Sequence, residues 1–209
     1  MSITASRRQF LGAGLAATAA SWAGMATALP MIAQGAQRAG LQLDRFVFDG
    51  RYAECVAIAR HAGRYGVRST QTSGDLMDLW YNHLDLQWKR APKALAGMTT
   101  RGALFVLERL AADYRMRVVY RGEHAAPRQS RIEHTLSGPA DMLLHVSSAH
   151  DLFLWEALLG RAMTQFPTGS PANATARVEM TTAARGTALR EEPLFSWIIA
   201  PRLSAPRAA

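Results

Sequence analysis

Short apolar segments of the chain alternate with longer segments in which apolar residues recur three or four positions apart. The short segments have the length of buried strands, and the longer ones place their apolar residues on one face of a helix. The predicted strands cover residues 46–48, 67–72, 94–98 and 117–121, and the predicted helices between them cover residues 53–65, 75–89 and 104–114. This alternation through short connections favours an α/β fold with a mainly parallel, doubly wound sheet and helices on both faces.

The pattern changes after Tyr120. The remaining predicted elements are a hairpin, one long helix and two further strands, which cover residues 118–123 with 132–136, 140–166, 178–182 and 194–200. We therefore expect C-terminal antiparallel strands and one long helix beside the parallel part. All of these elements belong to a single α/β domain over residues 44–201, and residues 202–209 are expected to form a disordered tail.

The N-terminal part of the chain lacks this alternation and carries a paired-arginine motif instead. Arg7 and Arg8 are adjacent and stand just before Phe10 and Leu11. A weakly hydrophobic segment made largely of Ala and Gly follows over residues 11–28, and no acidic residue occurs before or within it. This arrangement resembles a bacterial twin-arginine (Tat) signal peptide, which is an address read by an export receptor.

The resemblance implies that the Tat translocase exports the chain, already folded, to the periplasm. It also implies cleavage of the leader after residue 28 or 35, with residues 29–43 forming a tether. The alternatives are an ordinary buried helix or an uncleaved membrane anchor, because about 20 apolar residues suffice to span a bilayer. The many small residues and the Leu29-Pro30 break argue against a permanent span. We expect membrane contact only transiently, through the leader.

The chain is basic, with a formal net charge of +8 from 24 Lys and Arg against 16 Asp and Glu. Its arginines are scattered, and no dense basic run or aromatic-basic motif accompanies them, so no nucleic-acid partner is predicted. A solvated surface accounts for the charge, with an anionic ligand or an acidic partner as the alternative. The single cysteine, Cys55, excludes an internal disulfide and the usual cysteine-based metal clusters.

Polar residues follow the predicted strands where helices begin. In open α/β sheets, ligands bind beyond the carboxyl ends of the strands, at the point where the strand order reverses. If the strand order is 2-1-3-4, that point lies between the first and third strands. The candidate ligand-binding residues there are Asp49, Arg51, Thr99, Thr100 and Arg101.

These residues suit a carboxylate or a phosphate. The free N–H groups at the start of the third helix attract anions, and threonine hydroxyls and an arginine fork add hydrogen-bond donors. The alternative is that Thr99 or Thr100 caps that helix and that the arginines are solvated.

The histidines and serines show no recognised catalytic pattern. None of the six histidines occurs in a His-Glu-x-x-His motif, and no metal site is predicted. His124 and His134 lie at the ends of the predicted hairpin, where a register with Arg121 opposite His134 favours an exposed, salt-bridged surface. The chain has no Gly-x-Ser-x-Gly elbow, dinucleotide fingerprint or phosphate loop, so it specifies no cofactor.

Two functions follow from these observations. The first is an exported periplasmic accessory or binding protein, a non-catalytic partner of a co-exported redox enzyme, because Tat cargo is rich in such enzymes and their partners. The second is a small periplasmic enzyme or ligand-binding domain that uses an anion site at the switch point of the sheet.

Overall fold

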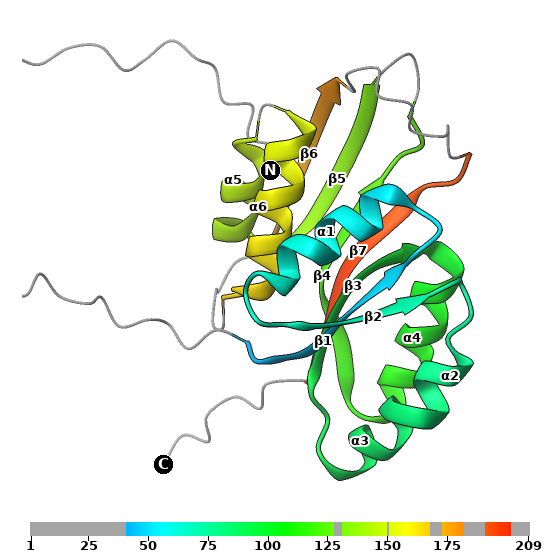
Figure 1. The fold of residues 1–209 in the computed structure, drawn as a ribbon. Coiled ribbons are helices and arrows are strands. Elements are labelled where there is room, and N and C mark those ends of the chain that lie inside the picture. Colours follow the sequence, from blue (N-terminus) through cyan, green and yellow to red (C-terminus); the bar gives the residue numbers. More distant parts are fainter. Residues whose placement is uncertain (1–40, 128–130, 150, 168–172, 182–190, 202–209) are drawn as a thin grey trace, which may run out of the picture. The chain divides into compact units, whose positions relative to one another are not determined.

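A computed structural model of the chain describes residues 41–127, 131–149, 151–167, 173–181 and 191–201. These residues form a seven-stranded sheet with the strand order β2-β1-β3-β7-β4-β5-β6 (Figure 1). The strands are β1 (Leu43–Asp49), β2 (Arg68–Thr72), β3 (Ala94–Thr100), β4 (Met116–His124), β5 (Arg131–Pro139), β6 (Asn173–Thr181) and β7 (Leu194–Pro201).

Helices cover both faces of this sheet, so the predicted α/β class is confirmed (Figure 1). One face packs against α1 (Ala53–Gly63), α5 (Ala140–Ser147) and α6 (Leu152–Thr164). The other packs against α2 (Met77–Leu79), the π-helical turn η1 (Trp80–Leu84), α3 (Asp85–Arg90) and α4 (Arg101–Asp113). No helix among the described residues has the length and apolar character needed to cross a bilayer.

The finer prediction of a mainly parallel, doubly wound sheet is supported only in part, because the sheet is mixed. Only the pairings of β1 with β2 and with β3 are parallel, whereas the other four pairings are antiparallel. The cause is β7, which returns from the C-terminal end of the chain and inserts between β3 and β4, antiparallel to both. Almost every residue of β7 is buried, as expected for a central strand covered on both faces.

The prediction of one long helix over residues 140–166 is wrong, because the segment forms two helices, α5 and α6. The Asp151 side chain accepts a hydrogen bond of 2.7 Å from the backbone N–H of Leu154. This contact caps the N-terminus of α6. Asp151 therefore begins a new helix inside a segment whose apolar pattern is continuous.

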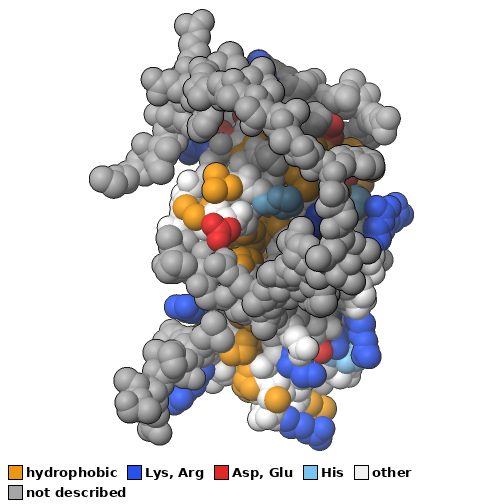
Figure 2. Space-filling view, turned by 90° about the vertical axis from the view of Figure 1, so that its left-hand side faces the viewer, with side chains coloured by type: hydrophobic (Ala, Val, Ile, Leu, Met, Phe, Trp, Pro, Cys, Tyr) orange, Lys and Arg blue, Asp and Glu red, His pale blue; other side chains and the backbone are white. Residues whose placement is uncertain are grey.

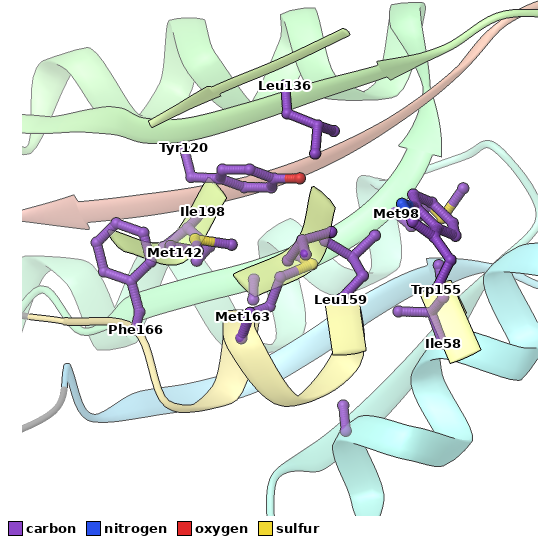
Figure 3. Close-up of a cluster of buried hydrophobic side chains, with 14 of the residues drawn as sticks. Ile58, Met98, Tyr120, Leu136, Met142, Trp155, Leu159, Met163, Phe166 and Ile198 are labelled. Atoms are coloured by element: carbon purple, nitrogen blue, oxygen red, sulfur yellow. The ribbon is translucent and has the colours of Figure 1, made fainter. Parts of the chain in front are cut away.

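The core between the sheet and the helices α1, α5 and α6 holds the larger cluster of buried side chains (Figure 3). Ile58 from α1 and Trp155 and Leu159 from α6 pack there against Met98 of β3 and Leu136 of β5. Helix α6 therefore connects the parallel and antiparallel halves of the sheet through apolar contacts. Burial of this kind contributes about 25 cal/mol per Å² of apolar surface.

Glu156 of α6 makes the stability of this layer depend on pH. Burial, with a smaller contribution from the nearby Glu54 carboxylate, raises the pKa of Glu156 from 4.5 to about 7. The folded chain therefore holds the proton more tightly than the unfolded chain does. The stability that this proton contributes is complete below about pH 4.5 and is lost as the pH rises through about 7.

We expect Glu156→Gln, which keeps the neutral form at every pH, to raise the melting temperature above about pH 7 and to change it little near about pH 4. Thermal unfolding of both proteins across this pH range measures the difference. An increase in melting temperature of the same size at both ends of the range would contradict the assignment of the effect to Glu156 ionisation.

Candidate functional site

The carboxyl ends of β1, β2, β3 and β4 meet at one edge of the sheet. β1, β2 and β3 are parallel, and β4 shares their direction because both β3 and β4 run antiparallel to β7. The chain passes from β1 to β2 on one side and then returns to β3 on the other side of β1. The strand order therefore reverses between β1 and β3, where ligands bind in open α/β sheets.

Asp49, the last residue of β1, is fully buried and bonded to Arg51. One carboxylate oxygen accepts hydrogen bonds from the backbone N–H and the Nε of Arg51, at 3.1 and 2.9 Å. The other accepts a hydrogen bond from Nη2 at 2.6 Å. This bidentate pair neutralises Asp49, while half of the Arg51 side chain remains exposed. Asp49 therefore holds Arg51 in place and presents no free negative charge.

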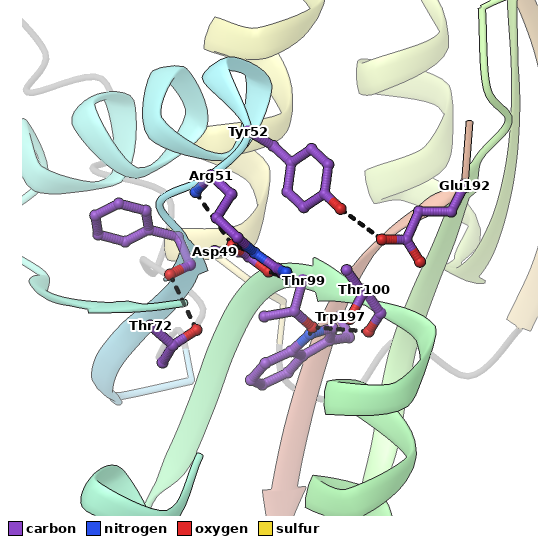
Figure 4. A network of polar contacts seen from close by, with 9 residues as sticks. Asp49, Arg51, Tyr52, Thr72, Thr99, Thr100, Glu192 and Trp197 are labelled. Atoms are coloured by element: carbon purple, nitrogen blue, oxygen red, sulfur yellow. Dashed lines mark hydrogen bonds and ion pairs between the residues drawn. The ribbon is translucent and has the colours of Figure 1, made fainter. Parts of the chain in front are cut away.

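The hydroxyl of Thr99 is also occupied (Figure 4). It accepts a hydrogen bond of 3.0 Å from Nε1 of Trp197 in β7, and it donates one of 3.3 Å to the carbonyl of Thr100. Trp197 is fully buried, so this contact satisfies an indole N–H that would be costly to bury alone. Thr99 therefore joins β3 to β7 and does not cap helix α4.

Thr100 occupies the N-cap position of α4 in an extended backbone conformation, with φ −70° and ψ 165°. Its side chain makes no capping hydrogen bond, so the expected alternative, in which a threonine caps this helix, is wrong. Thr100 is only 8% exposed, and its hydroxyl makes no hydrogen bond with any described residue. Among the described residues, the Thr100 hydroxyl beside the first turn of α4 thus has no hydrogen-bond partner.

Arg101 is the first residue of α4, and its side chain is exposed. Within the described ranges, no hydrogen bond or ion pair connects it to Asp49 or Arg51. Figure 4 shows Asp49, Arg51, Thr99 and Thr100 close together at the edge of the sheet. The structure therefore brings four of the five predicted residues into one cluster and leaves Arg101 beside it, on the first turn of the helix.

Tyr52 and Glu192 are two residues of this edge that sequence reasoning missed (Figure 4). The Tyr52 hydroxyl donates a hydrogen bond of 2.5 Å to a carboxylate oxygen of Glu192. This hydrogen bond, together with burial, raises the pKa of Tyr52 to about 12. Tyr52 precedes α1 and Glu192 precedes β7, so the contact spans 140 positions of sequence. Only the insertion of β7 beside β3 makes them neighbours.

A second polar cluster lies at the same edge but on the face covered by α5 and α6. Nδ1 of His124 lies 2.9 Å from Nδ1 of His134, and Nε2 of His124 lies 2.8 Å from the hydroxyl oxygen of Ser196. The Tyr120 hydroxyl is 3.1 Å from the same Ser196 oxygen. Both histidines are only 1% exposed, and His134 stacks on the Trp155 ring with the centroids 4.2 Å apart. We call His124, His134, Ser196 and Tyr120 the histidine cluster.

The prediction that these histidines lie on a salt-bridged surface is wrong. His124 pairs directly with His134, and Arg121 pairs with Ser137 rather than with His134. The observed register therefore differs by three positions from that of the hairpin expected around residues 126–128. Because side chains alternate between the faces of a sheet, an odd shift in register moves His134 from the expected face to the opposite one.

The order of the contacts from Ser196 through His124 to His134 resembles that of a nucleophile, a base and an orienting group. Ser196, however, is fully buried between the sheet and its helices. A substrate cannot contact its hydroxyl in this arrangement. The structure therefore favours the edge between β1 and β3 over Ser196 as the place where a ligand binds.

No group of three His, Cys, Asp or Glu side chains suited to a metal ion is found within the described ranges. Comparisons of the chain with protein-family models, with curated proteins and with solved structures find no match. The chemistry of the site is therefore inferred from its own residues.

Proposed function

We propose that this protein binds a small anionic ligand, with a carboxylate or phosphate group, at the sheet edge between β1 and β3. The observation that carries the proposal is the Thr100 hydroxyl, which bonds to no described residue and lies beside the uncapped first turn of α4. A threonine hydroxyl can donate a hydrogen bond to an anion, and helix N-termini attract anions. A bound anion would accept hydrogen bonds from both.

The charges around this edge favour one small anion. The 13 residues of α4 give its N-terminus a partial positive charge. Arg101 is exposed on the first turn and can turn its guanidinium toward a ligand there. Asp49 does not repel an anion because Arg51 neutralises it. The Glu192 carboxylate is held at this edge by its hydrogen bond from Tyr52. Its negative charge repels anions, so the site favours a ligand of low negative charge.

A calorimetric titration with inorganic phosphate tests this proposal. We expect Arg101→Ala to weaken phosphate binding by about tenfold, because a hydrogen bond to a charged group contributes about 1.5–3 kcal/mol. Thr100→Val, which keeps the shape of the side chain and removes its hydroxyl, should also weaken binding without unfolding the protein.

Arg109→Ala is the matched control, because it removes the same charge from an exposed position of the same helix. It should leave phosphate affinity close to that of the unchanged protein. Equal losses from Arg101→Ala and Arg109→Ala would assign phosphate binding to the general positive charge and would overturn the proposed site.

Export and a protein partner are further proposals that the sequence supports. The motif residues Arg7, Arg8, Phe10 and Leu11 lie outside the described residues. Two large apolar side chains, Leu144 of α5 and Phe153 of α6, favour a partner because each is 73% exposed. Figure 2 shows that hydrophobic side chains reach the surface on the side of the molecule where these helices lie.

We therefore propose that the folded chain is exported by the Tat route and joins a co-exported protein, such as a redox enzyme. Mass spectrometry of the native periplasmic complex would identify the cleavage site and any partner together. Recovery of the mature protein alone, with no accompanying subunit, would count against the partner.

A further inference from the structure

We propose that strand β6 pairs antiparallel with the β6 of a second copy of this chain, so that the two sheets join edge to edge. β6 is the last strand of the sheet, and among the described residues no strand lies along its outer side (Figure 1). An edge strand directs unpaired backbone N–H and C=O groups outward, where another strand can bind them. This edge is separate from the proposed anion site between β1 and β3.

The two edge strands of the sheet differ in how well they are protected from such pairing. β2 has only five residues, whereas β6 has nine. β6 contains no Pro or Lys, and its pairing with β5 is continuous over its whole length. Short strands, prolines, lysines and bulges are features that prevent one edge from pairing with another. β6 lacks all four, so it is the edge that can accept a second strand.

The side chains of β6 alternate between two faces of the sheet. Ala176, Val178 and Met180 belong to the apolar cluster beneath α5 and α6. Arg177 and Glu179 lie on the opposite face, where their side chains are 74% and 58% exposed. Because the residues opposite one another in an antiparallel pair share a face, a partner strand must match these faces. Only registers that place odd-numbered positions opposite odd-numbered positions do so.

The charges select one of these registers. With a two-fold axis at Val178, Arg177 of each copy lies opposite Glu179 of the other. An axis at Arg177 places two arginines opposite one another, and an axis at Glu179 places two glutamates so. Opposite charges directly across a strand pair stabilise it, and like charges destabilise it. A larger shift pairs neither residue with a charged residue of β6 and shortens the paired segment. The axis at Val178 is therefore the favoured one.

The ion pairs within each chain extend across this joint. Glu179 accepts a hydrogen bond of 2.9 Å from Arg131 of β5, and Arg177 donates one of 2.8 Å to Glu133 of the same strand. In the dimer, Glu179 lies between Arg131 of its own chain and Arg177 of the second copy. The row of charges thus alternates in sign from one β5 to the other, so no charge meets a like charge at the joint.

The apolar face favours the same register. With the axis at Val178, this residue lies opposite Val178 of the second copy, and Met180 lies opposite Ala176. A large side chain therefore lies beside a small one on each side of the axis. The apolar residues of both copies then form one continuous surface on the face that α5 covers.

Sedimentation velocity of the full chain, with two single charge reversals, tests the dimer. We expect the unsubstituted chain to be a dimer at about 100 µM, and Arg177→Glu and Glu179→Arg each to weaken dimerisation at least about tenfold. Each substitution replaces both attractive pairs about the axis with repulsive ones. Circular dichroism of each variant checks that it is folded.

An equimolar mixture of the two variants gives the sharpest result. One chain then carries two glutamates at positions 177 and 179, and the other carries two arginines. Every opposite pair in a mixed dimer is therefore attractive, and we expect the mixture to recover the dimer that each variant alone lacks. Mixing would not restore a dimer that was lost through damage to the fold.

The matched control is Arg117→Glu, which makes the same charge change at an exposed position of the inner strand β4 and should leave dimerisation unchanged. A monomeric unsubstituted chain, or a mixture no more dimeric than its components, would overturn the proposal. If a variant does not fold, hydrogen exchange of the unsubstituted chain replaces it. The outward-facing amides of β6 should then exchange more slowly as the concentration rises, and exchange that is independent of concentration would overturn the proposal equally.

Discussion

Gly97→Ala is expected to destabilise the protein by about 3 kcal/mol or more, at the upper end of the range for overpacked cores. A Cβ at position 97 would lie 2.3 Å from the carbonyl oxygen of Val47 in β1 and 2.5 Å from the ring of Trp197 in β7. The first neighbour is backbone in the adjacent strand. The second is a fully buried indole that is also bonded to Thr99. Neither can move without separating β3 from the strands beside it.

Urea unfolding of Gly97→Ala measures this effect, with Gly63→Ala as the control. Gly63 ends α1, and a Cβ there would meet nothing within 4 Å. The control should be neutral or stabilising by up to about 1 kcal/mol, because alanine favours a helix more than glycine does. A Gly97→Ala protein as stable as the unchanged chain would contradict the close approach of Trp197 to β3.

Trp155→Ala is expected to cost about 3–5 kcal/mol, the usual range for deleting a large aromatic side chain from a core. Trp155 is 2% exposed and packs in the cluster beneath α6 (Figure 3). Its ring also stacks on His134 and meets the edge of His124, with centroids 4.2 and 4.9 Å away. Deleting it opens a cavity and removes the side chain that covers both imidazoles.

Trp155→Phe should cost much less, because Nε1 of Trp155 donates to no acceptor among the described residues and the substitution loses no hydrogen bond. Denaturant unfolding of both variants gives the comparison. A cost below about 1 kcal/mol for Trp155→Ala would show that the ring does not fill the core as described.

The pattern of apolar positions was sufficient to predict the strands and most of the helices. Residues 94–98 were expected as a strand and lie within β3, and the segment predicted over 117–121 lies within β4. The spacing of apolar residues between neighbouring positions is enough to predict these elements. The division of residues 140–166 into two helices depends on the Asp151 cap, a single polar contact that apolar spacing does not reveal.

The order of the strands could not be predicted in the same way. Local spacing cannot show that β7 inserts between β3 and β4, because that placement depends on contacts between distant segments. The same insertion brings Glu192 to Tyr52, Trp197 to Thr99 and Ser196 to His124. The sequence therefore predicts none of these three contacts, although it does indicate the candidate polar residues that follow β1 and β3.

The histidine cluster shows how a small error in register changes a chemical conclusion. A hairpin centred near Pro127 would place His134 opposite Arg121, whereas the observed register places it opposite His124. The first arrangement gives a solvated, charged surface and the second gives two adjoining imidazoles in the core. The position of the turn sets the register of a hairpin, and residue type alone does not fix that position.

The most direct test of the proposed anion site is a phosphate titration of the ¹⁵N-labelled full chain, followed by the backbone amide resonances. Binding at the first turn of α4 should shift the amides of Arg101, Gly102 and Ala103 the most, because these N–H groups would donate to the anion. Saturable shifts centred on these residues are the expected result. Shifts that avoid this turn, or that grow linearly and are spread over surface arginines, would contradict the site.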